Sequence, residues 1–463
     1  MDPVKKDMMG VAVSRGLSLT AGVVTGLLLP KLLTVSDYGY LKIFTLYLTY
    51  TALLHFGFVD GILLKFAGRD YEMLRREQLR TYTRFFALFQ VAAGCALSVA
   101  GSLFQDPAYR FILRMLGVNM VLVNLTTYYQ FISQATRRFS EYSAKQLLAA
   151  VFKAGLVIVL LILRSMGVLE VSYRLYIIAL NGIDGVMLLW YVWIYRDITF
   201  GPGMPLKEQR GEIGELFKQG ILLTLAYQVS HLVLVLDRQF VSVLYPTDTY
   251  AVYSFAYNLV MMLSVMISSL AVVLLPVLKR VEPERIKPYY RKTLSVTAIL
   301  TGAALCCYFP LVGLIRWFLP EYEQSLSYLA AVLPALMYSS CISVVMFTFC
   351  KALEQNAGFF KTGCMVLGIG CLTNGAAYGL FRTPLAISYA SLLTMAAWFL
   401  LQERQLYKHT GMKGRKEFFY LTVLAIGFLT AARIVSSCWV GLAAYLVWFL
   451  AATWCFYRKD AVK

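Results

Sequence analysis

Charged residues are scarce in this sequence of 463 residues: only 15% are Asp, Glu, Lys or Arg, whereas 59% are hydrophobic. An average soluble domain carries about a quarter charged residues, and no single core could hide this much apolar surface from water. The composition therefore excludes a soluble globular protein. It predicts a chain that crosses a membrane several times.

The residues of common catalytic and metal sites are scarce as well. Three histidines, His55, His231 and His409, stand at no metal-ligand spacing, and there is no GxSxG, HExxH or GxxxxGK[ST] motif. The nine cysteines lie inside apolar stretches without CxxC pairs, which is typical of small buried side chains. We therefore expect no enzyme activity, no cofactor, no metal centre and no ATP hydrolysis by the chain itself.

Long apolar runs dominate the sequence, each near the length of about 20 residues that a helix needs to span a bilayer. We expect fourteen transmembrane helices, at residues 8–33, 41–66, 84–104, 111–133, 147–166, 174–194, 218–244, 250–278, 293–318, 326–350, 362–381, 385–403, 418–435 and 438–456. The predicted fold class is all-α, in a polytopic membrane protein.

Basic residues exceed acidic ones, 43 against 25, for a net charge of +18. They stand in short clusters between the apolar runs, which argues against a nucleic-acid partner. With both termini in the cytoplasm, 30 of the 43 fall at cytoplasmic ends and loops and 9 at the opposite ends. Because Lys and Arg concentrate in cytoplasmic loops, we expect both termini to be cytoplasmic.

The longest polar stretch lies near the middle of the chain and contains Gly201-Pro202-Gly203-Met204-Pro205. When the sequence is aligned with itself at an offset of 212 positions, residues 33–39 align with residues 245–251. Each of these two segments is a polar turn that precedes an aromatic-rich run. We therefore predict two pseudo-symmetric six-helix lobes, 1–200 and 218–410, joined by a cytoplasmic linker at 201–217. Two additional helices follow at 411–463.

Two arginines lie within predicted helices, where a charge costs roughly 2.5–3.5 kcal/mol. Arg15 shares a small, polar face of the first helix, and Arg238 follows Asp237 but points about 100° away from it around the seventh helix. Each could bind a phosphate by paired hydrogen bonds. The alternatives are a packing seam with Arg15 reaching the cytoplasmic surface, and an ion pair of Arg238 with Asp237 or another helix.

Aromatic and polar side chains on other predicted helices are candidates for contacts with a sugar. They are Tyr47 on the second helix, His231 on the seventh, and Tyr253 and Tyr257 on the eighth. An aromatic stripe at helical spacing also serves packing or the membrane interface, so that alternative stays open.

Two carboxylates, Asp60 and Asp184, also lie within apolar runs. Each could bind Na⁺ or a proton and so couple an ion to transport. Alternatively they pair with Lys65 and Lys153.

Three segments resemble those of a known transporter family. Residues 33–68, LTVSDYGYLKIFTLYLTYTALLHFGFVDGILLKFAG, resemble the second-helix signature of Wzx-type flippases in the multidrug/oligosaccharidyl-lipid/polysaccharide (MOP) exporter superfamily. Residues 127–161, with Gln134-Ala135-Thr136-Arg137-Arg138-Phe139, are similar to the family's turn between helices four and five. Leu236-Asp237-Arg238 followed by Ala251-Val252-Tyr253-Ser254 is similar to its junction of helices seven and eight.

The resemblance implies two six-helix bundles that open alternately to the two sides of a bacterial inner membrane, around a central cationic cavity. It implies a flippase that moves a polyprenyl-diphosphate-linked oligosaccharide to the outer leaflet for capsule, O-antigen or another surface polysaccharide. The expected partners are this substrate, membrane lipid, and the polymerase and glycosyltransferases of the pathway. The two additional helices resemble the peptidoglycan-precursor branch, but only Arg15 represents that branch's arginine cluster, which argues against lipid II.

Two alternatives remain. One is a multidrug exporter of the same superfamily, driven by Na⁺ or H⁺ at Asp60 or Asp184. The other is a membrane-embedded glycan polymerase or ligase, against which the lack of a large external loop argues.

Overall fold

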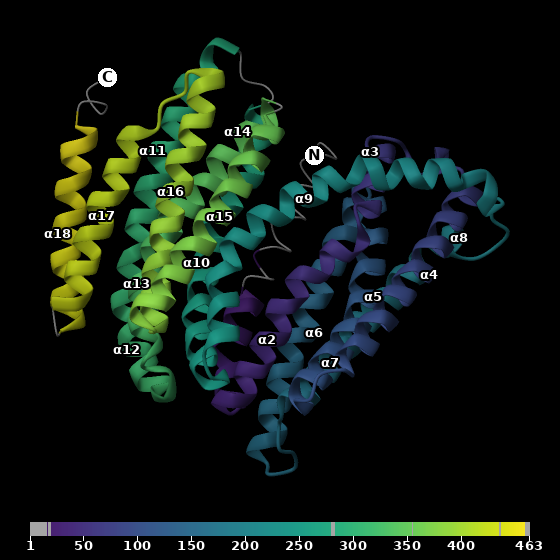
Figure 1. Ribbon diagram of the computed structural model, residues 1–463, viewed down its shortest axis with the longest axis horizontal. Coiled ribbons are helices and arrows are strands. Elements are labelled where there is room, and N and C mark those ends of the chain that lie inside the picture. Colours follow the sequence, from purple (N-terminus) through teal and green to yellow (C-terminus); the bar gives the residue numbers. More distant parts are fainter. Residues whose placement is uncertain (1–15, 17–19, 279–282, 354, 435–436, 459–463) are drawn as a thin grey trace. The chain divides into compact units, whose positions relative to one another are not determined.

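The computed structural model describes residue 16 and residues 20–278, 283–353, 355–434 and 437–458, and all regular structure in this part of the chain is helical (Figure 1). A helix at Thr20–Leu32 comes first. It is followed by α2 (Val35–Thr51), α3 (Phe58–Phe66), α4 (Arg76–Gly101), α5 (Pro107–Ala135), α6 (Phe139–Ser165), α7 (Tyr173–Ile194), α8 (Arg196–Thr199), α9 (Leu206–Leu244), α10 (Thr247–Leu278), α11 (Ile286–Ala304), α12 (Tyr308–Phe318), α13 (Ser325–Ser340), α14 (Phe347–Ala352), α15 (Asn356–Phe381), α16 (Pro384–Thr410), α17 (Arg415–Ile434) and α18 (Cys438–Tyr457).

Ten helices in the described ranges are long and apolar enough to cross a membrane, or eleven if the bent pair Val35–His55 and Phe58–Phe66 counts as one span. The predicted all-α polytopic fold is confirmed. The exact number of fourteen stays a prediction. The three other predicted runs overlap the shorter apolar helix Thr20–Leu32 and the helices α10 and α17.

Polar residues at the helix starts explain why the chain turns where it does. Thr34 caps α2 by accepting a hydrogen bond from the backbone N–H of Asp37 at 3.1 Å. Asp106 does the same for α5, whose first residue is Pro107. These side chains satisfy N–H groups that a helix leaves unpaired at its start, which matters most where water is scarce.

The chain divides into two compact units, unit 1 at 1–228 and unit 2 at 229–463. The division falls inside α9, which is one continuous helix and begins within the linker that we predicted at 201–217. The predicted lobe and linker boundaries stay predictions.

Unit 1 is held together by a close crossing of α3 and the first half of α9. The chain bends by 59° just before α3, where Gly57 has a left-handed φ of 86°. A Cβ atom on Gly57, Gly61 or Gly220 would overlap backbone atoms of the facing helix. The two helix backbones are therefore in direct contact, as small residues allow in membranes.

Replacing Gly220 by Ala should destabilise the protein, because the added methyl group would overlap the carbonyl oxygen of Gly57. Overpacking at a tight contact costs about 1–3 kcal/mol. Gly214, on the same helix, has no neighbouring atom within 4 Å of the place a methyl group would take, so Gly214→Ala should be neutral or slightly stabilising. Thermal unfolding of the detergent-purified variants measures both, and equal melting temperatures for the two would refute the crossing.

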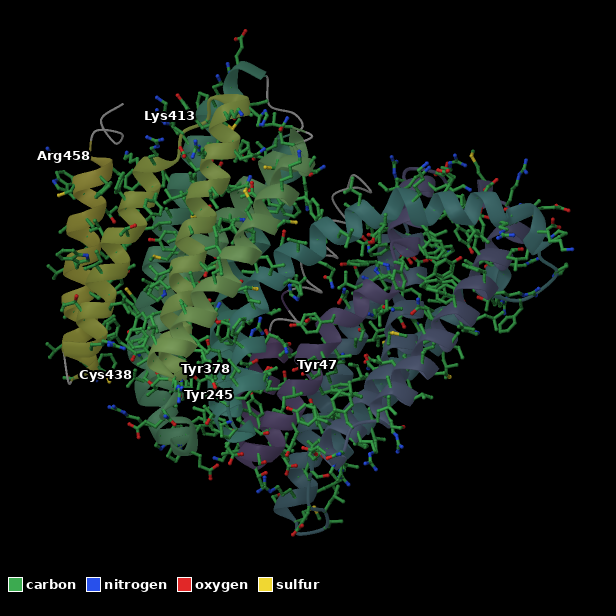
Figure 2. All side chains as sticks on the ribbon, in the orientation of Figure 1. Tyr47, Tyr245, Tyr378, Lys413, Cys438 and Arg458 are labelled. Carbon is green, nitrogen blue, oxygen red and sulfur yellow. The ribbon has the colours of Figure 1, made fainter. Side chains whose placement is uncertain are left out.

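Unit 2 is organised around a buried helix. The stretch from Ser325 to Ala352 is largely buried and packs against α10, α16 and α17. A π-helical segment, Cys341–Met346, interrupts it. Figure 2 shows Lys413 and Arg458 near one end of this unit and Cys438 near the other, so α18 runs from one end of the unit to the other.

Candidate functional site

The eight predicted site residues fall into three groups. Arg15 lies outside the described residues. Unit 1 contains Tyr47, Asp60 and Asp184, and unit 2 contains His231, Arg238, Tyr253 and Tyr257. The four residues in unit 2 lie on α9 and α10. Two of them, His231 and Tyr257, line the same cavity.

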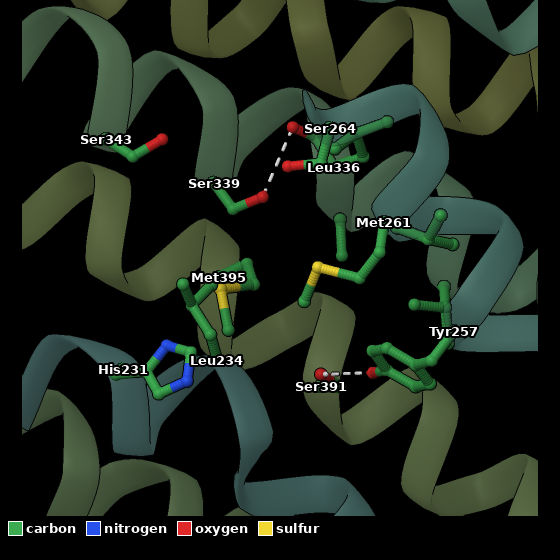
Figure 3. A pocket seen from close by; sticks show the side chains of 13 residues that line it. His231, Leu234, Tyr257, Met261, Ser264, Leu336, Ser339, Ser343, Ser391 and Met395 are labelled. Atoms are coloured by element: carbon green, nitrogen blue, oxygen red, sulfur yellow. Dashed lines mark hydrogen bonds between the residues drawn. The ribbon is translucent and has the colours of Figure 1, made fainter. Parts of the chain in front are cut away.

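A cavity of about 190 Å³ lies within unit 2, lined by residues of α9, α10, α13, α16 and the π-helical segment (Figure 3). Its walls carry four serine hydroxyls and one imidazole among apolar groups. The lining residues are His231, Leu234, Tyr257, Val260, Met261, Ser264, Val332, Ala335, Leu336, Ser339, Ser343, Ser391 and Met395. An apolar pocket with a few convergent polar groups is the usual form of a ligand site.

The π-helical segment shapes one wall of this cavity. Its other residues are buried, whereas Ser343 is exposed because it faces the open space. Ser339, one turn earlier, also lines the cavity and donates a hydrogen bond to the carbonyl oxygen of Leu336 at 3.2 Å. Single π turns inside α-helices are frequent at functional sites, where they re-aim side chains.

Arg238 lies beside the cavity without an acidic partner. Its guanidinium is 4.9 Å from the centre of the Tyr257 ring, and Nη2 donates to the carbonyl oxygen of Leu234 at 3.3 Å. Its Nε is buried and has no hydrogen-bond partner. No carboxylate in the described part of the chain forms an ion pair with it within 4 Å, although Asp237 attracts it electrostatically, and most of its hydrogen-bond donors are unused.

The carboxylate of Asp237, which precedes Arg238 in the sequence, forms its hydrogen bonds with other groups. Asp237 is 1% exposed and accepts hydrogen bonds from the Tyr253 hydroxyl at 2.9 Å and from the backbone N–H of Arg238 at 2.8 Å. Tyr253 is itself fully buried, with its ring 5.4 Å from that of Tyr257. In this arrangement Tyr253 supports Tyr257, which lines the cavity, and offers no free ring face of its own.

Asp60 lies at the crossing of α3 and α9. It accepts a hydrogen bond from Thr224, and Nε2 of His55 is 3.9 Å from it. The predicted pairing of Asp60 with Lys65 is wrong. Lys65 is five residues further along α3 and pairs with Glu212, because this spacing turns the lysine well away from Asp60 around the helix.

Asp184 does form the predicted pair with Lys153, at 3.3 Å between Nζ and Oδ1. Its other carboxylate oxygen accepts from Nδ2 of Asn119 at 3.0 Å, and the same nitrogen donates to Asn181 at 2.7 Å. The remaining unit 1 candidate, Tyr47, is half-buried on α2 with its ring 6.2 Å from that of Tyr50 (Figure 2).

The sequence interpretation missed most of the cavity. Serines on α10, on α13 with its π-helical segment, and on α16 come together only because three stretches that are distant in the sequence pack side by side. A serine in an apolar helix is also common where helices merely pack. The π-helical segment has no sequence signal that we could use.

The sequence profile described as "Polysaccharide biosynthesis protein" matches residues 5–282, more than half of the chain. The chain belongs to this family. A search of curated proteins found no match to the sequence.

This polysaccharide biosynthesis family protein shares its fold with transporters of the MOP superfamily. A lipid II flippase, MurJ, in an inward closed conformation aligns with a TM-score of 0.72 at 13% identity, covering 99% of each chain. An inward-facing MATE family multidrug transporter gives 0.65 at 12% identity over 86% of this chain and 95% of its own. The outward-facing form of a MATE transporter gives 0.57 at 10% identity, over 87% and 95%. At these low identities the structural alignments show a shared fold, that of a multi-pass membrane protein.

Among the residues that the structure describes, no group of three or more His, Cys, Asp or Glu side chains could hold a metal ion. The candidate site is instead a small cavity with hydroxyl groups, an imidazole and a neighbouring guanidinium. Such groups bind polar, uncharged and anionic parts of a ligand.

Proposed function

We propose that this member of the polysaccharide biosynthesis family is a flippase. It carries a polyprenyl-diphosphate-linked oligosaccharide repeat unit from the inner to the outer leaflet by alternating access. The product serves the assembly of capsule, O-antigen or another surface polysaccharide, with the polymerase and glycosyltransferases of that pathway as partners. The lipid tail stays in the bilayer while the polar head crosses through the protein.

Arg238 is the observation that carries this proposal. A guanidinium within a membrane-spanning helix is costly, and one that forms no ion pair with a carboxylate is a candidate for contact with a charged substrate. Its planar fork of donors matches a phosphate, and the Tyr257 ring holds it in place. A cationic substrate would be repelled at this position, which disfavours a drug exporter.

The cavity next to Arg238 suits the sugar part of the substrate. Tyr257 and His231 line it together with serine hydroxyls that can exchange hydrogen bonds with sugar hydroxyls. Tyr47 in unit 1 is proposed as a further sugar contact, and Arg15 as a second phosphate contact.

The charge distribution sets the proposed direction. With both termini cytoplasmic, α9 runs outward, and Arg238 lies six residues before its outer end at Leu244. A membrane potential that is negative inside favours outward movement of each negative charge by about 2.3 kcal/mol per 100 mV. The substrate's diphosphate is thus driven toward the outer leaflet.

Reconstitution into vesicles tests the function directly. Vesicles that contain the purified chain and a polyprenyl-diphosphate-linked oligosaccharide should expose the whole glycan pool to an added lectin, whereas empty vesicles should expose only their outer leaflet. A single cysteine at position 248, in place of Asp248, should react with an impermeant thiol reagent from outside intact cells, which fixes the orientation. Efflux of cationic dyes without glycan movement would identify a multidrug exporter instead.

A further inference from the structure

Two glutamates are buried near the end of unit 2 where Lys413 lies (Figure 2). Glu403 on α16 and Glu417 on α17 are each 3% exposed. Neither forms an ion pair within 4 Å in the described part of the chain, although Lys416 and Arg291 attract the Glu417 carboxylate from a greater distance. Buried carboxylates are costly unless they are paired, protonated or bound to a cation.

Hydrogen bonds to the two glutamates tie α17 to the neighbouring helices. Oε1 of Glu403 accepts from the backbone N–H of Gly414, in the loop before α17, at 3.2 Å. Oε1 of Glu417 accepts from the hydroxyl of Ser295 on α11 at 2.8 Å. An ionised carboxylate can accept about four hydrogen bonds, so each glutamate keeps acceptor capacity for a further group.

A tyrosine hydroxyl without a hydrogen-bond partner lies beside the two carboxylates. Tyr290 on α11 is fully buried, and its hydroxyl oxygen has no hydrogen-bond partner. Glu417 and Glu403 both act on it electrostatically, yet neither is within hydrogen-bond distance of it. Buried hydroxyls in folded proteins nearly always have a partner, so a bound group between the hydroxyl and the carboxylates would explain this arrangement.

Gly414 leaves space between the Tyr290 hydroxyl and Glu403. It does not have a left-handed φ, so the backbone does not require glycine here. A Cβ atom at this position would lie 3.6 Å from the hydroxyl oxygen of Tyr290, 3.4 Å from Cγ of Glu403 and 2.9 Å from Cδ2 of Leu294. A side chain at position 414 would therefore fill the space that separates the two oxygen-bearing groups.

We propose that Glu403, Glu417 and Tyr290 form a Na⁺ site at the junction of α11, α16 and α17. All the ligand atoms that these side chains offer are oxygens, which suit a hard cation. Ca²⁺ takes about six to eight oxygens and Mg²⁺ keeps several waters, more than these buried groups provide, so a monovalent cation fits better. The site uses neither Asp60 nor Asp184 and does not depend on the substrate that the protein carries.

A Na⁺ ion in this site would offset the charge of the two glutamates and give the Tyr290 hydroxyl a partner. Because α17 packs against both α11 and α16, the ion would also hold α17 on the rest of unit 2. Ligands that bind only the folded state raise its stability, so Na⁺ should stabilise this protein against unfolding.

The test is thermal unfolding of the detergent-purified full chain in a titration with sodium chloride, with N-methylglucamine chloride keeping the total chloride constant. Na⁺ should raise the melting temperature of the wild type by roughly 2–4 °C once it reaches about ten times Kd. Glu403→Gln should lose this rise with the loss of a charged ligand.

Tyr290→Phe is the sharpest variant, because it removes a single oxygen. It should lose most of the rise with Na⁺. Without Na⁺ it should melt no lower than the wild type, since the hydroxyl makes no hydrogen bond within the described protein. The matched control is Tyr191→Phe, at a fully buried tyrosine of unit 1, which should keep the whole rise.

Two results would overturn the site. If Tyr290→Phe and Glu403→Gln show the same rise as the wild type, Na⁺ binds elsewhere in the protein. If the wild type does not respond to Na⁺ at all, there is no such site, and a melting temperature that then rises on acidification would show that the glutamates hold a proton instead.

Discussion

Arg238→Ala should abolish export of the surface glycan while the protein still inserts in the membrane at normal levels. The variant removes a guanidinium that forms no ion pair within 4 Å in the described structure but that attracts the buried Asp237 carboxylate, so the amount of folded protein is measured together with export. Substrate binding loses two charge-assisted hydrogen bonds to phosphate, worth at least about 3 kcal/mol together. That corresponds to about a hundredfold in affinity. Surface glycan in cells that carry only the variant measures the effect.

Two further variants make this result specific. Arg238→Lys should restore export only in part, since an ammonium group keeps the charge but loses the paired donors. Arg433→Ala is the matched control, because Arg433 on α17 also has its guanidinium near a tyrosine ring, 5.0 Å from the centre of Tyr389. Arg433 is exposed and borders no described cavity, so its loss should leave export unchanged. Full export by Arg238→Ala would remove the basis of the phosphate site.

Helical geometry favoured diverging side chains for Asp237 and Arg238, although the sequence left an ion pair between them open. Consecutive residues point about 100° apart on a helix, so the two side chains diverge. In the structure Asp237 bonds Tyr253 while Arg238 lies over Tyr257. The partner tyrosines, by contrast, follow from the packing of α10 on α9, which a single sequence does not specify.

The helical membrane fold could be predicted from the sequence for a simple physical reason. A span must satisfy its own backbone hydrogen bonds, so each long apolar run has little choice but to be a helix. The contacts between spans are harder to predict. The crossing at Gly57 and Gly220 depends on which glycines face each other, and Lys65 could be assigned to Glu212 only once α9 was placed against α3.

The cavity was the least predictable part for the same reason. Ser339, Ser343 and Ser391 are ordinary small residues in apolar helices, and only the packed bundle brings them to one place. His231 was identified because it shares a polar arc of its predicted helix with Arg238, and Tyr257 because it belongs to an aromatic face at helical spacing. Their assignment as sugar contacts stays a prediction.

Asp184→Asn should sharply lower the amount of folded protein, because it leaves the Lys153 ammonium inside the membrane without its carboxylate. The pair is only partly buried, but a lone charge within a membrane-spanning helix costs roughly 2.5–3.5 kcal/mol. Replacing both partners can be nearly neutral. The double variant Asp184→Asn with Lys153→Met should therefore recover both protein level and glycan export.

This pair of variants decides between the flippase and a cation-coupled exporter. If Asp184 serves only to neutralise Lys153, the folded double variant exports glycan. If Asp184 instead binds a Na⁺ ion or a proton that drives transport, the double variant is folded but inactive, since no carboxylate remains at this position to exchange the ion. Protein level, surface glycan and dye efflux are measured in the same cells, so a folding defect and a coupling defect are distinguished. We expect glycan export in the double variant, because an ammonium group already occupies the position at Asp184 that a coupling cation would need.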